Sequence, residues 1–123
     1  MIIDHIGVAV SDYEKSKEFF CKALAPLGIT VVMEVQGWAG LGKNGKAELW
    51  FGKHSEVQRP LHVAFLAENR EQVRAFYRAA LAAGGTDNGP PGIREAYHPN
   101  YYGAFVIGPD GHNVEAVCHR PDA

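Results

Sequence analysis

Apolar residues alternate with small or polar residues in some stretches of the chain and recur at helical spacing in others. Residues 2–10 alternate and are rich in β-branched side chains, which predicts a strand, and Ser11-Asp12 then offers a helix N-cap. From 13 to 24 an apolar face opposes a charged face, which predicts an amphipathic helix that ends by Gly28. Three strands are predicted next, over residues 30–35, 38–41 and 46–51. The first half of the chain is therefore predicted to be β-α-β-β-β.

The second half repeats this order after a polar connector over residues 53–60. A strand is predicted over 61–67, and an amphipathic helix begins at an Asn69 cap and ends at Gly84-Gly85. Residues 87–102 then diverge from the first half, because they contain a Gly-Pro-Pro-Gly run and a cluster of aromatic residues, and they read as an insertion. Two closing strands are predicted on either side of a turn, over residues 103–107 and 112–118.

The two halves also match residue by residue, counted from His5 and from His62. Asp4-His5-Ile6-Gly7-Val8-Ala9-Val10 recurs as Leu61-His62-Val63-Ala64-Phe65-Leu66-Ala67. Further pairs at equal distances from the two histidines are Asp12 and Asn69, Phe19-Phe20 and Phe76-Tyr77, Leu24 and Leu81, and Gly28 and Gly85. We therefore predict an α+β fold of two β-α-β-β-β modules, 1–53 and 60–119, within a single domain 1–123. A pseudo-twofold axis between the modules is expected to carry the two histidines to related places near one cleft.

Composition limits the classes of function. Of 123 residues 46% are hydrophobic and 21% charged, with a net charge of -2, which is typical of a soluble globular protein. Lys and Arg total 12 against 14 acidic residues and are scattered, so a nucleic-acid partner is not expected. No apolar stretch approaches the length of a membrane span, and the start lacks a leader pattern, so a cytoplasmic location is expected. Cys21 and Cys118 are too few for a disulfide framework and are expected to be buried free thiols.

Two histidines and two glutamates recur in the two halves and form a candidate metal-ligand set: His5, Glu48, His62 and Glu115. The spacing from histidine to glutamate is longer in the second half, but the extra residues fall within 87–102, so both glutamates are expected at equivalent strand positions. Imidazole nitrogens and carboxylate oxygens suit Zn, Ni, Co, Mn or Fe(II), and four protein ligands leave two octahedral positions for water or substrate oxygens. A strand histidine is otherwise a hydrogen-bonded core or surface residue, and a strand glutamate is usually solvated. Two observations favour a metal site. A histidine and a glutamate recur together in both halves, and a glutamate buried on a strand without a partner would cost roughly several kcal/mol, so it needs a partner such as a metal ion.

Aromatic, basic and imidazole side chains are candidates for substrate binding. One comes from the first half and the others from the insertion: Trp50, Arg94, Tyr97, His98, Tyr101 and Tyr102. Phenol donors and one guanidinium suit a carboxylate or an enolate. The same aromatic residues are equally suited to packing the loop over the edge of the sheet.

The doubled β-α-β-β-β unit, with His near the start of each half and Glu on its last strand, resembles the vicinal oxygen chelate superfamily. That superfamily includes glyoxalase I, methylmalonyl-CoA epimerase, extradiol dioxygenases, fosfomycin-resistance enzymes and bleomycin-binding proteins. The resemblance covers essentially the whole chain, and its most specific segments are Asp4-His5-Ile6-Gly7-Val8, Pro60-Leu61-His62-Val63-Ala64-Phe65 and Pro109-Asp110-Gly111-His112-Asn113-Val114-Glu115. It implies an incomplete barrel with one divalent metal ion inside, and a homodimer is common among its members.

By resemblance, His5, Glu48, His62 and Glu115 match the ligand positions of glyoxalase I. A set of only His5, His62 and Glu115 would resemble the dioxygenases and fosfomycin enzymes, so Glu48 favours the isomerase branch. The implied function is a glyoxalase I-like lyase or isomerase that acts on a small 2-oxo or hemithioacetal-type substrate through a metal-bound enediolate, with Glu115 as first choice of base and Glu48 as second. In glyoxalase I the site forms across the dimer interface. The sequence leaves open whether the halves pair within one chain or with a partner.

Two other functions remain compatible with the sequence. A metal-free protein could sequester an aromatic small molecule in the same cleft, as Trp38, Trp50 and the tyrosines of the insertion suggest. An Fe(II) extradiol-type dioxygenase would need only three of the ligands. The basic residues with which glyoxalase I holds glutathione carboxylates have no convincing match here.

Overall fold

The structure, a computed structural model, describes residues 3–57 and 60–121. Residues 1–2 and 58–59, at the start of the first predicted module and inside the predicted connector, lie outside the described residues, as do 122–123. The first module contains β1 (Ile6–Val10), α1 (Tyr13–Leu24), the short 3-10 helix η1 (Ala25–Leu27), β2 (Thr30–Val35), β3 (Trp38–Lys43) and β4 (Lys46–Lys53). The second contains β5 (His62–Leu66), α2 (Arg70–Ala82), β6 (Thr86–Ile93), β7 (Tyr102–Ile107), the 3-10 helix η2 (Pro109–Gly111) and β8 (Asn113–Cys118).

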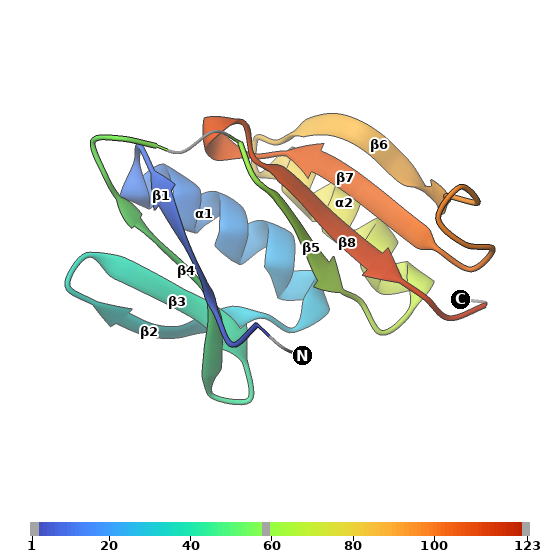
Figure 1. The fold of residues 1–123 in the computed structure, drawn as a ribbon, viewed down its shortest axis with the longest axis horizontal. Helices are drawn as coiled ribbons and strands as arrows, with labels where there is room; N and C mark the ends of the chain where they lie inside the picture. The colour runs from blue at the N-terminus through green and yellow to red at the C-terminus, as the bar shows by residue number, and fades with distance from the viewer. Residues whose placement is uncertain (1–2, 58–59, 122–123) are drawn as a thin grey trace.

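Each module folds into its own four-stranded sheet with the same topology. The strand orders are β1-β4-β3-β2 and β5-β8-β7-β6, and in each sheet the first strand is parallel to the last while the other pairs are antiparallel. Neither sheet closes on itself, so the predicted α+β fold of two β-α-β-β-β modules is confirmed. Figure 1 shows the two helices behind the sheets, and β1 beside β5 running in the opposite direction.

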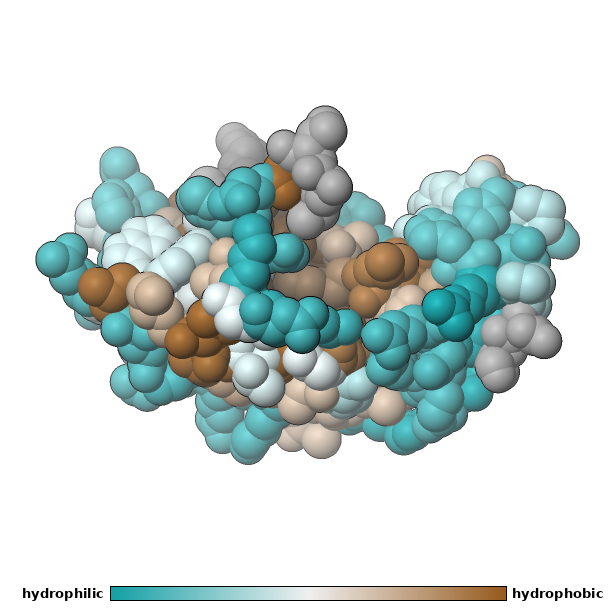
Figure 2. All heavy atoms as spheres, turned by 90° about the horizontal axis from the view of Figure 1, so that it is seen from below, coloured by the Kyte–Doolittle hydropathy of each residue, from teal (hydrophilic) through white to brown (hydrophobic). Residues whose placement is uncertain are grey.

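One continuous hydrophobic core joins the two modules behind the sheets. The helices start where the sequence predicts, because Asp12 Oδ1 accepts from the Lys15 amide at 3.0 Å and Asn69 Oδ1 accepts from the Gln72 amide at 2.8 Å. The core includes the buried rings of Phe19, Phe20, Phe51 and Phe76. The opposite face of the first sheet is less covered: hydrophobic side chains lie at the surface over the first module (Figure 2), and Met33 and Val35 of β2 are exposed.

The segment 87–102 is not a single insertion. Its first part lies in β6, which is the counterpart of β2, and only residues 94–101 form an additional loop. Pro90 and Pro91 are tolerated because β6 is an edge strand, where a missing N–H breaks no ladder on the outer side. The two prolines argue against a strand when only the sequence is considered, but an edge strand tolerates them.

In the first module, strand register places Glu48 just before the segment of β4 that pairs with β1. Ile6 of β1 pairs with Leu49, so Glu48 lies one residue before that pair, and it is exposed. Gly7, the next residue of β1, pairs with Trp50.

In the second module, the corresponding register is different. His62 pairs with Asn113, and Glu115 pairs with Ala64, the residue that repeats Gly7 of the first module. Trp50 therefore occupies the position equivalent to Glu115, and the prediction that the two glutamates are equivalent is wrong. The reason is the turn: a two-residue hairpin precedes β4, whereas η2 lengthens the connection before β8.

The contact between Tyr13 and Glu34 makes the stability of the first module depend on pH. The Tyr13 hydroxyl donates to Glu34 Oε1, to which Lys17 Nζ also donates at 2.9 Å. Burial and then the hydrogen bond to Glu34 raise the pKa of Tyr13 from 10.0 to about 12. A raised pKa contributes stability that is full below pH 10 and is lost as the pH rises through 10 to about 12.

We therefore expect the unfolding free energy of the unaltered protein to approach that of Tyr13→Phe over this pH range. Urea unfolding of both proteins at pH values on either side of this interval measures the difference. Tyr97→Phe is the matched control, because Tyr97 is 63% exposed. A difference that does not change with pH would contradict the assignment.

Candidate functional site

A fully buried carboxylate lies in the middle of β8, on the face of the second sheet that points away from the helices. The side chain of Glu115 is 0% exposed, whereas its neighbours Val114 and Ala116 point into the core behind the sheet. His62 Nε2 lies 2.6 Å from Glu115 Oε1, and the Tyr101 hydroxyl donates to Glu115 Oε2. Both carboxylate oxygens therefore have a partner, as burial requires.

Tyr101 keeps its proton in this arrangement. Burial, followed by the hydrogen bond to Glu115 and the negative charge of that carboxylate, raises the pKa of Tyr101 well above its usual range. Gly103 leaves room for the pair, because a Cβ at this position would lie 3.2 Å from Tyr101 Cε1 and 3.3 Å from Glu115 Oε2. The phenol is thus a fixed donor that orients the carboxylate.

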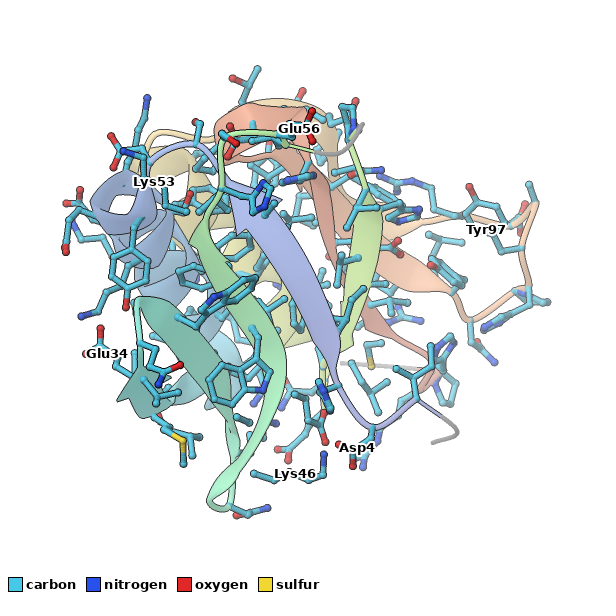
Figure 3. All side chains as sticks on the ribbon, turned by 60° about the vertical axis from the view of Figure 1, so that its left-hand side comes forward. Asp4, Glu34, Lys46, Lys53, Glu56 and Tyr97 are labelled. Carbon is cyan, nitrogen blue, oxygen red and sulfur yellow. The ribbon has the colours of Figure 1, made fainter. Side chains whose placement is uncertain are left out.

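The loop over residues 94–101 carries Tyr101 to Glu115. The loop is closed by the Arg94 amide, which donates to the Tyr101 carbonyl at 2.8 Å. The Tyr97 ring packs edge-on against Tyr101 at 4.8 Å between centroids, and His98 stacks on His119 with 2.9 Å between Nε2 and Nδ1. Figure 3 shows Tyr97 at the outer end of this loop.

Arg94 and Tyr102, two further predicted substrate residues, lie on different faces of the sheet. The Arg94 guanidinium covers the Phe105 ring, with Cζ 5.3 Å from the centroid, and Phe105 pairs directly with Glu115 across β7 and β8. Tyr102 instead packs against the core, and Arg74 of α2 donates to its hydroxyl at 3.2 Å. The Tyr102 ring therefore lies on the helix side of the sheet, away from the Tyr101 ring and Glu115.

His5 and Trp50 lie together in the first module, at an open pocket of about 750 Å³. Residues that line it include His5, Met33, Trp38 and Trp50. His5 Nδ1 contacts Asp4 Oδ2 at 2.7 Å, and Lys46 Nζ contacts the other oxygen of Asp4 at 3.0 Å. Figure 3 shows Asp4 and Lys46 close together at this end of β1. The hydrogen bond from His5 and then the contact with Lys46 lower the pKa of Asp4, which therefore remains a carboxylate beside the imidazole.

Comparisons with known proteins agree with the fold described above. A model of the Glyoxalase/Bleomycin resistance protein/Dioxygenase superfamily matches residues 2–116. The chain belongs to this superfamily. A search of curated proteins found no significant match.

Solved structures of the glyoxalase/bleomycin resistance/dioxygenase superfamily share the fold over nearly the whole chain. A glyoxalase/bleomycin resistance protein from Albidiferax ferrireducens T118 is 27% identical, with a TM-score of 0.80 over 98% of this chain and 100% of the other. A possible glyoxalase from Bacillus cereus is also 27% identical, with a TM-score of 0.68 over 96% and 99%. An enzyme of the glyoxalase/bleomycin resistance protein/dioxygenase family from Burkholderia phytofirmans PsJN, at 17% identity and a TM-score of 0.74 over 96% and 98%, shows likeness of fold alone.

The ligand set that resemblance to this superfamily implies is divided in the structure. His62 and Glu115 are in contact, and their nitrogen and oxygen donors suit a divalent ion. Within residues 3–57 and 60–121, however, no three His, Cys, Asp or Glu side chains come together in a group that could hold a metal. His5 precedes β1 and His62 begins β5, and these two strands start at opposite edges of the molecule, at the bottom and top of Figure 1. His62 is not among the residues that line the pocket at His5, so these two histidines do not line one pocket of the described residues. One chain of this superfamily member thus presents half of the implied set in one place.

Sequence reasoning missed Phe105, Asp4 and Lys46 at these two places. Phe105 could have been found from strand register, since it lies directly across from Glu115, but that register depends on the length of the turn at η2. Asp4 adjoins His5 in the sequence, whereas nothing in the pattern places Lys46 beside it.

Within the part of the chain that the structure describes, no helix has the length and apolar character to cross a membrane.

Proposed function

We propose that this superfamily member is a metal-dependent lyase or isomerase that moves a proton at a carbon next to an oxygen of a small 2-oxo or hemithioacetal-type substrate. The observation that carries the proposal is the buried carboxylate of Glu115, with both oxygens held, next to a His62 side chain that is 55% exposed. A carboxylate fixed beside the open face of a sheet is suited to general acid-base catalysis. Glu115 is the base, and Tyr101 is a positioning residue because it acts through Glu115.

A divalent ion held by His62 and Glu115, whether Zn, Ni, Co, Mn or Fe, would supply Lewis-acid polarisation of a substrate oxygen and so acidify the adjacent C–H. The chain's own residues do the rest. Tyr101 holds Oε2 of Glu115, and Oε1 faces the exposed side chain of His62. Because the phenol keeps its proton, it does not compete with Glu115 as a base.

The remaining ligands come from a second copy of the chain in this proposal. His5 and Glu48 belong to the first module and do not contact His62 or Glu115 of the second. In a twofold dimer, a contact between the first module of one copy and the second module of the other occurs twice, because the symmetry repeats it. A twofold dimer that sets the first module of one copy against the second module of the other therefore completes two sites at once. Glu48, which is exposed in the single chain, is free to take part in such a contact.

Mixed dimers of His5→Ala and His62→Ala test this arrangement. Each variant alone should lose metal and turnover of the methylglyoxal-glutathione hemithioacetal. After the two are mixed under conditions that exchange subunits, one of the two sites in each mixed dimer has both histidines, so metal content and turnover should partly return. Mixing His5→Ala with Glu48→Ala is the matched control and should restore nothing, because both changes fall on the same module.

Two outcomes would count against the proposal in different ways. If a fully loaded wild-type protein retains no divalent metal, the metal-dependent function fails. If metal binds but mixing restores nothing, the site lies within one chain. The dioxygenase alternative needs only His5, His62 and Glu115, and it alone predicts that Glu48→Gln keeps ligand-dependent oxygen uptake.

A metal-free binding protein is the second candidate, and the open pocket at Trp38 and Trp50 favours it. Two indole rings beside exposed Met33 suit a flat aromatic ligand. Anilinonaphthalene sulfonate is a suitable probe. Quenching of tryptophan fluorescence that is unchanged by chelator and lost in Trp50→Ala would support binding without metal.

A further inference from the structure

A row of four directly paired residues crosses the second sheet at the level of Glu115. Ala64 of β5 pairs with Glu115 of β8, Glu115 with Phe105 of β7, and Phe105 with Gly89 of β6. Neighbouring strands are about 4.8 Å apart, so Gly89 lies about 10 Å from Glu115 along this row. Phe105 lies between them on the same face and is nearly buried.

The guanidinium of Arg94 lies over Phe105 and Gly89 of this row, in a space that exists because residues 89 and 92 are glycines without side chains. A Cβ at Gly89 would lie 3.1 Å from Arg94 Nη2, and a Cβ at Gly92 would lie 3.1 Å from Nη1. Nη2 donates to the Pro90 carbonyl at 2.6 Å, and Cζ rests over the Phe105 ring. Gly89 also has a φ of +151°, a backbone conformation that side chains disfavour. The Gly-Pro-Pro-Gly run thus fixes the guanidinium in place.

Arg94 has no acidic partner among the described residues, in contrast to Arg74 and Arg78, which both pair with Glu71. Among the described residues its guanidinium donates one hydrogen bond, to a backbone carbonyl, although a guanidinium has five N–H donors. A positioned guanidinium whose charge is not neutralised is suited to bind an oxyanion with two parallel hydrogen bonds. The same row carries the catalytic carboxylate, so the oxyanion belongs to the molecule that Glu115 acts on.

We infer that Arg94 binds an anionic group of the substrate, and that the substrate is therefore a small organic anion with its acidic C–H a few bonds from a carboxylate or phosphonate. This inference rests on the proposed function. The guanidinium lies over Phe105, which pairs directly with Glu115 on the neighbouring strand, so a linker of a few bonds joins the anionic group to the carbon from which Glu115 takes a proton.

A matched pair of probes tests the inference by binding alone. Phenylpyruvate carries a carboxylate and its amide does not, while both carry the same ring and 2-oxo group; phenylphosphonate reports whether the anion can be a phosphonate. Affinities are measured by NMR titration of the wild-type protein, Arg94→Gln, Arg94→Lys and the control Arg78→Gln. Arg78 is exposed on α2 and lies outside the site.

The wild-type protein should bind phenylpyruvate at least about tenfold more tightly than its amide, since a charge-assisted hydrogen bond contributes about 1.5–3 kcal/mol. Arg94→Gln should abolish the preference, Arg94→Lys should retain part of it, and Arg78→Gln should leave it unchanged. Equal binding of acid and amide by the wild type, or a preference that survives in Arg94→Gln, overturns the inference. Metal content is measured in the same samples, so a failure of the anion site is distinguished from a failure of the metal-dependent function.

Discussion

Replacement of Glu115 by glutamine is expected to remove most of the catalytic activity while leaving the fold intact. Glutamine has the same shape and can still accept the hydrogen bond from Tyr101, so the buried site remains filled and satisfied. It cannot accept a proton from carbon or provide an anionic oxygen beside His62. Loss of a general base lowers turnover by about 10²-fold to 10⁴-fold, and we expect a loss in this range for the hemithioacetal, together with weaker binding of Zn²⁺ or Ni²⁺ in a calorimetric titration.

Two companion variants separate the role of Glu115 from simple packing. Tyr101→Phe removes the donor to Oε2 and leaves that oxygen buried without a partner, which should reduce stability by about 1–3 kcal/mol and shift the pH profile of turnover. Tyr97→Phe, on the exposed end of the same loop, should change neither property. If Glu115→Gln turns over substrate at the wild-type rate, Glu115 is not the base and the proposed mechanism is wrong.

The repeated architecture could be predicted from the sequence because both copies kept the local signals that specify it. Asp12 and Asn69 cap their helices as expected, and the alternating segments that follow His5 and include His62 form the first strand of each module. Such signals act over a few residues, so they survive independent divergence of the two halves. His62 and Glu115, two members of the predicted ligand set, are in contact, whereas the repeat wrongly made Glu48 the equivalent of Glu115.

What could not be predicted depends on register and on the relative placement of the modules. A one- or two-residue change at the η2 turn moves Glu115 along its strand, and no pattern in the sequence reports it. The result is that Trp50 rather than Glu48 lies opposite Gly7, with an indole where the second module has a carboxylate. The two modules therefore share their topology but not their side-chain chemistry: one carries a buried carboxylate beside a histidine, and the other an aromatic pocket.

The largest loss of stability from a single substitution is expected for Phe51→Ala. Phe51 is 0% exposed on β4, stacks on Phe20 at 5.2 Å between ring centroids, and lies 6.0 Å from Tyr13. Truncating a buried aromatic residue to alanine destabilises proteins by about 3–5 kcal/mol, because the apolar contacts are lost and a cavity remains. Against a total stability of about 5–15 kcal/mol for a domain of this size, the variant should unfold at a much lower urea concentration.

The same substitution also tests whether the first module is needed for the site that the second module carries. Phe51 points into the core while its neighbour Trp50 faces the pocket beside His5, so a loosened β4 disturbs the first-module surface without touching Glu115. If His5 and Glu48 complete a partner's site, Phe51→Ala should weaken metal binding even at temperatures where the protein stays folded by circular dichroism. Phe65→Ala, a half-buried position of β5 on the second module, is the comparison. A loss of less than about 1 kcal/mol for Phe51→Ala would show that the neighbouring rings of Phe20 and Tyr13 close the cavity.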